Sequence, residues 1–106
     1  MTGPLNDARM YGEPVTLHCE ATDTTARVQW TEYITNSNGA PISDGQYVLQ
    51  GHPNHIRYAI LTDSPTTFNL YINTSVREDG GRYKCADIYA PGSALHAELI
   101  MLGTKT

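Results

Sequence analysis

The 106-residue sequence contains no long apolar run and no cluster of basic residues. A membrane-spanning helix needs about 20 consecutive apolar residues, and no stretch here approaches that length. Recognition of phosphate needs grouped Lys and Arg side chains, whereas the seven basic residues of this chain are scattered and its formal net charge is −4. The sequence therefore argues against nucleic acid and anionic membrane surfaces as partners. Attachment to a membrane would need a segment outside this sequence.

Catalytic motifs are also missing from the chain. It has no nucleophile elbow, no Gly-rich phosphate loop and no paired carboxylates on a rigid element. We therefore do not expect an enzyme.

Four histidines raise the question of a metal site. Pro53 separates His52 from His55 and denies this pair a helical spacing. His18 falls on the solvent face of a predicted strand, and His96 is distant in sequence. We therefore expect scattered surface histidines, and neither a metal nor another cofactor.

Only two cysteines are present, Cys19 and Cys85. Two cysteines can form one disulfide bridge, or they can be buried free thiols of an intracellular protein. Their surroundings must decide between these alternatives.

Short β-prone runs alternate with turn clusters along the whole chain, and no segment of useful length has a helical period. In the first clear run, Val15, Leu17 and Cys19 share one face, which is typical of a half-buried strand. Both faces of the last run carry apolar residues, so two registers stay open there. The pattern is all-β. We predict strands at 15–21, 27–33, 46–49, 58–61, 67–72, 81–88 and 94–101, and turns at 36–39, 43–45, 62–65 and 89–93.

Three residues and one motif identify the fold. Trp30 lies 11 residues after Cys19, and Cys85 lies 66 residues after Cys19. Residues 79–85 read Asp-Gly-Gly-Arg-Tyr-Lys-Cys, which matches the pattern Asp-x-Gly-x-Tyr-x-Cys. These features resemble the immunoglobulin domain. The resemblance covers the chain from about residue 15 to residue 101.

The resemblance implies an immunoglobulin-like Greek-key β-sandwich of two antiparallel sheets bridged by a Cys19–Cys85 disulfide. It also implies that Trp30 packs on the bridge and that Tyr83 forms a tyrosine corner with the backbone near residues 76–79. Such a bridge persists outside the cytosol, so we expect an extracellular or cell-surface location. Intracellular immunoglobulin domains of the muscle type are the alternative.

The separation of the two cysteines indicates the variable type, because 66 residues leave room for the extra C′ and C″ strands. Arg57 lies 22 residues before Asp79, similar to the ion pair that closes one end of variable domains. Two solvated charges are the alternative. The Gly-x-Gly bulge of antigen receptors is missing from the last strand, so the resemblance favours an adhesion or innate-receptor module. We expect one domain over residues 1–106, with its core at about 14–102.

Variable-type domains bind through the sheet of their C, C′, F and G strands or through the loops at its end, and the resemblance implies the same surfaces here. Aromatic and aliphatic side chains are the usual anchors of interfaces. With Trp30 and Cys85 inward, alternation predicts a binding face that contains Thr31, Tyr33, Lys84, Ile88 and Tyr89. The other interpretation is that Tyr33 only covers a neighbouring strand and that Ile88 is an ordinary exposed residue.

We therefore predict an extracellular protein–protein recognition module of a cell-surface adhesion molecule or innate immune receptor. Its partner would be another protein, such as another immunoglobulin domain or a second copy of itself. The alternative is a secreted recognition domain that binds a non-self or small ligand through end loops at 23–26, 50–55 and 89–93.

Three further features concern secretion. Asn73-Thr74-Ser75 is an N-glycosylation sequon after a predicted strand, although Asn73 also suits a turn. Residues 1–4 lack the basic and apolar regions of a signal peptide, so a secreted form would have lost it. Residues 103–106 resemble an exit into a linker, which suggests the first domain of a longer protein.

Overall fold

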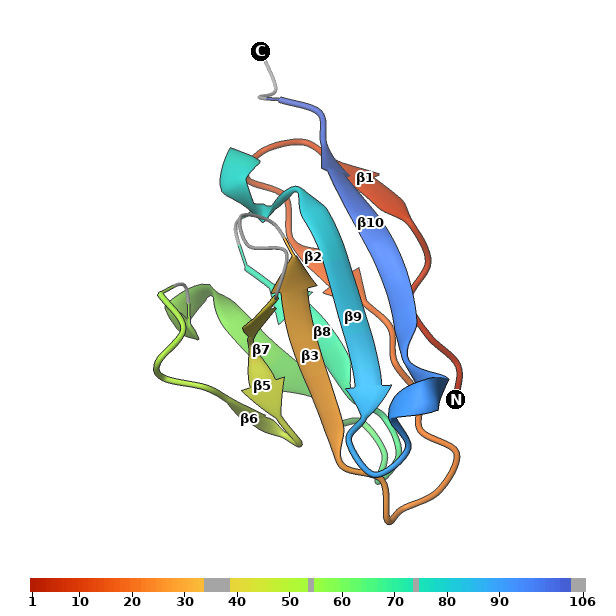
Figure 1. Cartoon of the computed structure of the whole chain (residues 1–106). Helices are drawn as coiled ribbons and strands as arrows, with labels where there is room; N and C mark the ends of the chain where they lie inside the picture. The colour runs from red at the N-terminus through yellow and green to blue at the C-terminus, as the bar shows by residue number, and fades with distance from the viewer. Residues whose placement is uncertain (34–38, 54, 74, 104–106) are drawn as a thin grey trace.

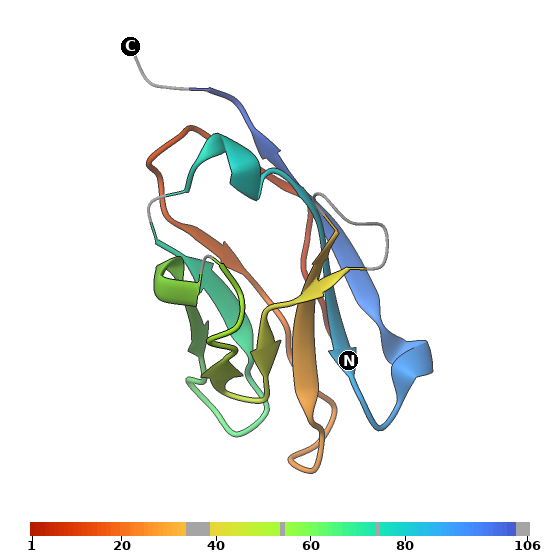
Figure 2. The same ribbon diagram turned by 60° about the vertical axis from the view of Figure 1, so that its left-hand side comes forward.

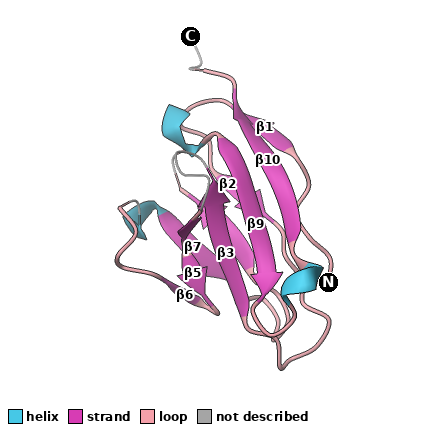
Figure 3. Ribbon diagram, in the orientation of Figure 1, coloured by secondary structure: helices cyan, strands magenta, loops and turns pink. Residues whose placement is uncertain are grey.

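The computed structural model describes residues 1–33, 39–53, 55–73 and 75–103 (Figure 1). Short strands dominate these residues, and three single-turn 3-10 helices lie between them (Figure 3). The helices are η1 (His55–Arg57), η2 (Arg77–Asp79) and η3 (Pro91–Ser93). The strands are β1 (Asp7–Arg9), β2 (Val15–Leu17), β3 (Val28–Tyr33), β4 (Ala40–Pro41), β5 (Ser43–Asp44), β6 (Tyr47–Val48), β7 (Tyr58–Leu61), β8 (Asn69–Ile72), β9 (Gly81–Asp87) and β10 (Leu95–Met101).

Two layers of sheet enclose the core (Figure 2). One sheet has the order β1-β10-β9-β3-β4, another has the order β2-β8-β7, and β5 pairs with β6 in a separate two-stranded sheet. All neighbours are antiparallel except β1, which runs parallel to β10. The short β4, β5 and β6 strands lie between β3 and β7 in sequence, where the variable type has its extra strands. The predicted all-β, Greek-key sandwich of the variable type is confirmed.

The core follows from the two-residue period of the strands. Cys19 and Cys85 are joined by a disulfide, and both are fully buried. Trp30 is also fully buried, pairs with Cys85 across β3 and β9, and donates from Nε1 to the Phe68 carbonyl at 2.7 Å. The open register of the last strand is settled, because Ala97 and Leu99 face the core.

The segment around Ile42 differs from the prediction. Residues 43–45 are not a turn, because Ser43–Asp44 forms β5 and the turn begins at Gly45. Ile42 is fully buried and its backbone N–H donates to the Trp30 carbonyl at 2.8 Å. Ser43 Oγ accepts from the Trp30 N–H at 3.1 Å, so a side chain replaces one ladder bond. The predicted turn at 36–39 lies, except for its last residue, outside the described residues.

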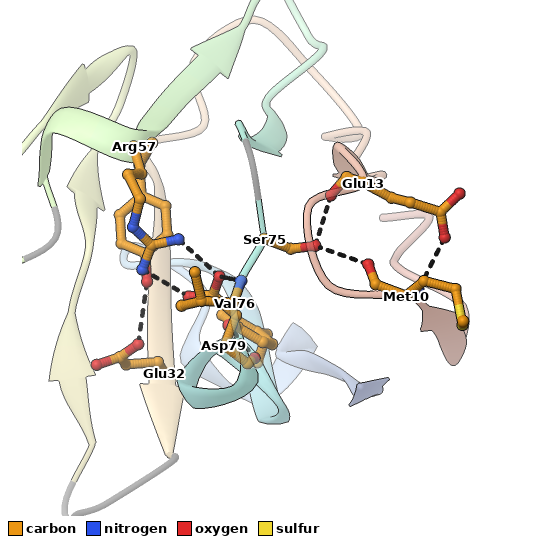
Figure 4. A network of polar contacts seen from close by, with 9 residues as sticks. Met10, Glu13, Glu32, Arg57, Ser75, Val76 and Asp79 are labelled. Carbon is orange, nitrogen blue, oxygen red and sulfur yellow. Dashed lines mark hydrogen bonds and ion pairs between the residues drawn. The ribbon is translucent and has the colours of Figure 1, made fainter. Parts of the chain in front are cut away.

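A network of hydrogen bonds closes the end of the sandwich near η2 (Figure 4). Arg57, the last residue of η1, donates to both carboxylate oxygens of Asp79, at 2.6 and 2.8 Å. The same carboxylate accepts from the Val76 N–H at 2.8 Å. Tyr83 donates its hydroxyl to the Asp79 carbonyl at 2.5 Å, which is the geometry of a tyrosine corner. Asp79 therefore supplies the acceptor for each of these hydrogen bonds at this end of the sandwich.

Arg27 and Asp44 tie the start of β3 to β5, with Nε and Oδ1 2.6 Å apart. The hydrogen bond from Arg27 holds the pKa of Asp44 below its usual range.

Because the pKa of Asp44 in the folded protein lies below its value in the unfolded chain, the ion pair with Arg27 contributes stability above pH ~3.9, and this stability is lost as the pH falls through the folded pKa. We expect Asp44→Asn to lower the urea midpoint slightly at neutral pH. At about pH 2 the two midpoints should coincide, and an unchanged difference there would contradict this assignment.

Candidate binding face

The outer surface of the five-stranded sheet carries the largest group of predicted binding residues. The register of β3, β9 and β10 decides which side chains point outward together. We call this surface the sheet face. Its outward positions on these strands are Gln29, Thr31, Tyr33, Arg82, Lys84, Ala86, His96, Glu98 and Ile100.

Tyr33 lies at the centre of a cluster built from three adjacent strands. Lys84 Nζ lies 5.6 Å from the centroid of the Tyr33 ring. The His96 ring lies 6.5 Å from the Tyr33 ring, centroid to centroid, and is tilted by 50°. His96 is directly opposite Lys84 on β10, so one lysine, one tyrosine and one histidine meet on one patch. A cation over an aromatic face is attractive, which holds the Lys84 chain against the ring.

Arg82 and Glu98 flank this cluster and pair at 3.2 Å, with about half of each side chain exposed (58% and 49%). Together with Tyr33 and Gly81 they line a shallow hollow of about 370 Å³. The ion pair is too exposed to contribute much to stability. It can exchange partners on docking, because both charges remain accessible to an incoming surface.

The predicted binding residues divide into three groups. Tyr33 and Lys84 lie on the sheet face and are half-buried. Ile88 and Tyr89 are exposed at 40% and 69%, but they follow β9 and lie at the end of the sheet, where the Ile88 N–H donates to the Arg27 carbonyl at 2.9 Å. Thr31 points to the sheet face but is only 6% exposed, so it offers almost no surface to a partner.

The burial of Thr31 has a local cause. β4 pairs alongside it, and Gly39 sits so close that a Cβ there would meet Thr31 Cγ2 at 2.7 Å. Alternation in the sequence predicts the side of the sheet to which a side chain points, but it does not predict whether neighbouring segments bury that side chain. Arg82, His96 and Glu98 were missed as face residues. Alternation with Tyr83 was a usable signal for Arg82, whereas the open register of the last strand gave no direction for His96 and Glu98.

His52 contradicts the prediction of surface histidines. It is 5% exposed, and its Nε2 lies 2.9 Å from Glu32 Oε1. Its ring meets the Tyr58 ring edge-on, with centroids 5.2 Å apart. The Tyr58 hydroxyl also donates to Glu32 at 3.3 Å, and burial is the first cause that raises the pKa of Tyr58. His52 is therefore buried against the carboxylate of Glu32, which lies 20 residues away in the sequence. The residues next to His52 in the sequence do not indicate this contact.

The position of His52 also shows that the three predicted end loops do not all lie at the same end of the sandwich. Residues 23–26 and 89–93 share one end of the sandwich, where Arg27 bonds to Asp87 and Ile88. Residues 50–53 lie beside Glu32, toward the other end of β3. The three loops therefore do not form one surface.

Asn73 is exposed just after β8, and its backbone N–H donates to the Arg57 carbonyl at 2.9 Å. Ser75 is fully buried and donates its hydroxyl to the Glu13 carbonyl at 2.5 Å. Thr74, the middle of the sequon, lies outside the described residues. The asparagine side chain thus reaches solvent on the sheet opposite the sheet face.

The part of the chain that the structure describes holds no group of three or more His, Cys, Asp or Glu side chains suited to a metal ion. It also holds no helix with the length and apolar character that crossing a bilayer requires.

The chain resembles known proteins in its structure and not in its sequence. The sequence matches no protein-family model, and no curated protein matches it significantly. The ZIG-8 IG1 domain, solved as a homodimer, aligns with a TM-score of 0.75 at 20% identity over 94% of this chain and 79% of that chain. Dpr1 IG1, solved bound to DIP-eta IG1, aligns with a TM-score of 0.80 at 18% identity over 95% and 91%. The first Ig domain of the mouse polymeric immunoglobulin receptor aligns with a TM-score of 0.78 at 18% identity over 99% and 96%.

Proposed function

We propose that this chain, which has the variable-type immunoglobulin fold, is an extracellular recognition module of a cell-surface adhesion molecule or innate immune receptor. It binds another immunoglobulin domain, or a second copy of itself, through the sheet face. We further propose that residues 1–106 form one domain. The observation that carries this proposal is the cluster of Tyr33, Lys84 and His96 on the sheet face.

The chemistry of the sheet face suits a protein partner. Tyr and Arg dominate the energetics of interfaces, and Tyr33 and Arg82 are neighbours across β3 and β9. Ile100 adds an apolar surface that is 56% exposed. Arg82 and Glu98 carry opposite charges, so two copies related by a two-fold axis can exchange these partners. The face is therefore compatible with itself as well as with another immunoglobulin domain.

Structural relatives support the same kind of partner. ZIG-8 IG1 was crystallised as a homodimer, and Dpr1 IG1 was crystallised with DIP-eta IG1. The disulfide supports an extracellular location, because such bridges persist outside the cytosol. A glycan on Asn73 would lie on the opposite sheet and would leave the sheet face open. No catalytic role is proposed.

The test is Tyr33→Ala. We expect it to weaken self-association or binding to a partner at least about tenfold, because it removes the central aromatic anchor. Sedimentation velocity over a concentration series measures self-association. Multivalent protein applied to cells that display candidate immunoglobulin domains measures binding to other partners.

Tyr71→Ala is the matched control, because Tyr71 is also half-buried but lies on β8 in the other sheet. A strictly monomeric protein at about 100 µM would remove the self-association form of the proposal. Equal binding by wild type and Tyr33→Ala would remove the sheet face as the binding surface.

A second candidate function rests on Ile88 and Tyr89. These exposed apolar side chains lie beside residues 23–26 at one end of the sandwich. They favour a secreted recognition domain that uses these end loops. Under that alternative, Tyr89→Ala abolishes binding and Tyr33→Ala has no effect.

A further inference from the structure

A second hollow lies away from the sheet face, between the β5–β6 turn and the loop that joins β7 to β8. We call it the turn cleft. Its walls are Arg27, which precedes β3, together with residues 44–47, residues 62–65 and Phe68. Figures 1 and 2 both show the two segments converging at the same end of the sandwich. The turn cleft measures about 710 Å³, within the usual range of sites for small ligands.

Aromatic and aliphatic groups form part of the turn cleft. Tyr47 is 69% exposed, and its hydroxyl accepts a hydrogen bond from Gln46 Nε2 at 3.1 Å. Phe68 is half-buried, and its backbone is fixed by the bond from Trp30 Nε1. Gly45 has φ of +61° and open space where a Cβ would lie, so the turn does not fill the hollow. The turn cleft therefore offers two aromatic rings to a ligand.

Polar groups surround these rings. Arg27 makes a two-pronged ion pair with Asp44, which neutralises both charges and fixes the guanidinium. Asp63 is exposed and, within the described residues, makes no hydrogen bond or ion pair. The three charged groups leave one net negative charge, which disfavours an anionic ligand. Their remaining donors and acceptors suit a ligand that both donates and accepts hydrogen bonds.

We propose that the turn cleft binds a neutral saccharide. A pyranose ring presents C–H bonds on one face, which pack against an aromatic ring such as Tyr47. Its hydroxyls can pair with Asp63, Gln46 and the Arg27–Asp44 pair. The two aromatic rings favour a saccharide over a basic side chain, because the Asp44 carboxylate is already paired with Arg27. The same chemistry is presented by a free oligosaccharide and by the glycan of a glycoprotein.

The experiment is an NMR titration of ¹⁵N-labelled protein with maltose, lactose, cellobiose and chitobiose at up to about 10 mM. We expect at least one of them to shift the amides of residues 44–47 and 62–68, with a Kd of about 1 mM. Tyr47→Ala should weaken this binding at least about tenfold, whereas Tyr47→Phe, which keeps the ring, should stay within about threefold of wild type. Tyr71→Ala serves again as the folded control. A glycopeptide carrying the same sugar distinguishes a protein-bound source from a free one.

Two outcomes would overturn the proposal. One is the absence of shifts at these amides with every neutral sugar. The other is a preference for a charged ligand, tested with sialyllactose and with N-acetylarginine amide. Asp63→Asn supports this distinction, because it should abolish binding of a cation but leave binding of a neutral sugar within a few-fold. Tyr33→Ala and Tyr47→Ala act on separate surfaces, so this proposal can fail while the proposed function holds.

Discussion

Replacing Cys19 and Cys85 by alanine is expected to lower the free energy of unfolding by about 4 kcal/mol. The disulfide closes a loop with a sequence separation of 66, and an open chain of that length gains much conformational entropy on unfolding. Domains of this size have a total stability of about 5–15 kcal/mol. The double variant should therefore be marginally stable or unfolded at 37 °C. Guanidinium unfolding followed by the fluorescence of the buried Trp30 measures the change.

Reduction provides an independent form of the same experiment. Wild-type protein in dithiothreitol should approach the midpoint of the double variant, since both lack the cross-link. Cys19→Ala alone should cost almost as much as the double variant, because either change opens the loop. A reduced protein with an unchanged midpoint would show that packing, and not the bridge, supplies this part of the stability.

The sequence predicted the centre of the fold because its signals there are local and redundant. Cys19, Trp30 and Cys85 each fall on an alternating strand, so their inward direction follows from the two-residue period. The motif at 79–85 fixes Tyr83 two residues before a cysteine, which is enough to place its hydroxyl near Asp79. Periodicity and motif agree at these positions.

Elements without such a period were missed. β1 (Asp7–Arg9) is half-buried at all three positions and pairs in parallel with β10, so its sequence shows no alternation. β4 and β5 have two residues each, which is too short for a period, and Ile42 between them was not expected in the core. His52 is buried by Glu32, a partner 20 residues away. Pairing and burial of this kind are set by tertiary contacts, which a pattern along the chain does not encode.

Alternation predicted which side chains of the sheet face point outward, but it did not predict which of them are covered by neighbouring segments. Tyr33 and Lys84 point outward as alternation requires, while Thr31 on the same face is hidden beside β4 and Gly39. His96 and Glu98 were left out because the register of the last strand was open. Once that register is known, both lie beside residues that had been predicted.

Asp79→Ala is expected to lower the free energy of unfolding by about 3–5 kcal/mol. Asp79 is fully buried, and its carboxylate receives two bonds from Arg57 and one from the Val76 N–H. Removing it leaves a partly buried guanidinium without its counter-charge, since the Arg57 side chain is only 24% exposed. The Val76 N–H also loses its acceptor. In the wild type, the hydrogen bond with Asp79 is the first cause that raises the pKa of Arg57. A guanidinium keeps its proton in proteins even without such a partner, so the arginine stays charged in the variant and the cost is not relieved by deprotonation.

A double-mutant cycle separates the cost of an orphaned charge from the net contribution of the pair. Replacing Arg57 and Asp79 together by Leu removes both charges, so this variant should be less destabilised than the sum of Arg57→Leu and Asp79→Leu. Tyr83→Phe removes only the hydroxyl bond to the Asp79 carbonyl and should cost about 1 kcal/mol, which calibrates the corner apart from the ion pair. Additive single effects in urea unfolding would mean that the two side chains act independently. In that case the geometry at this end of the sandwich would be held by the backbone of η2 and by Tyr83, and the ion pair would be its consequence.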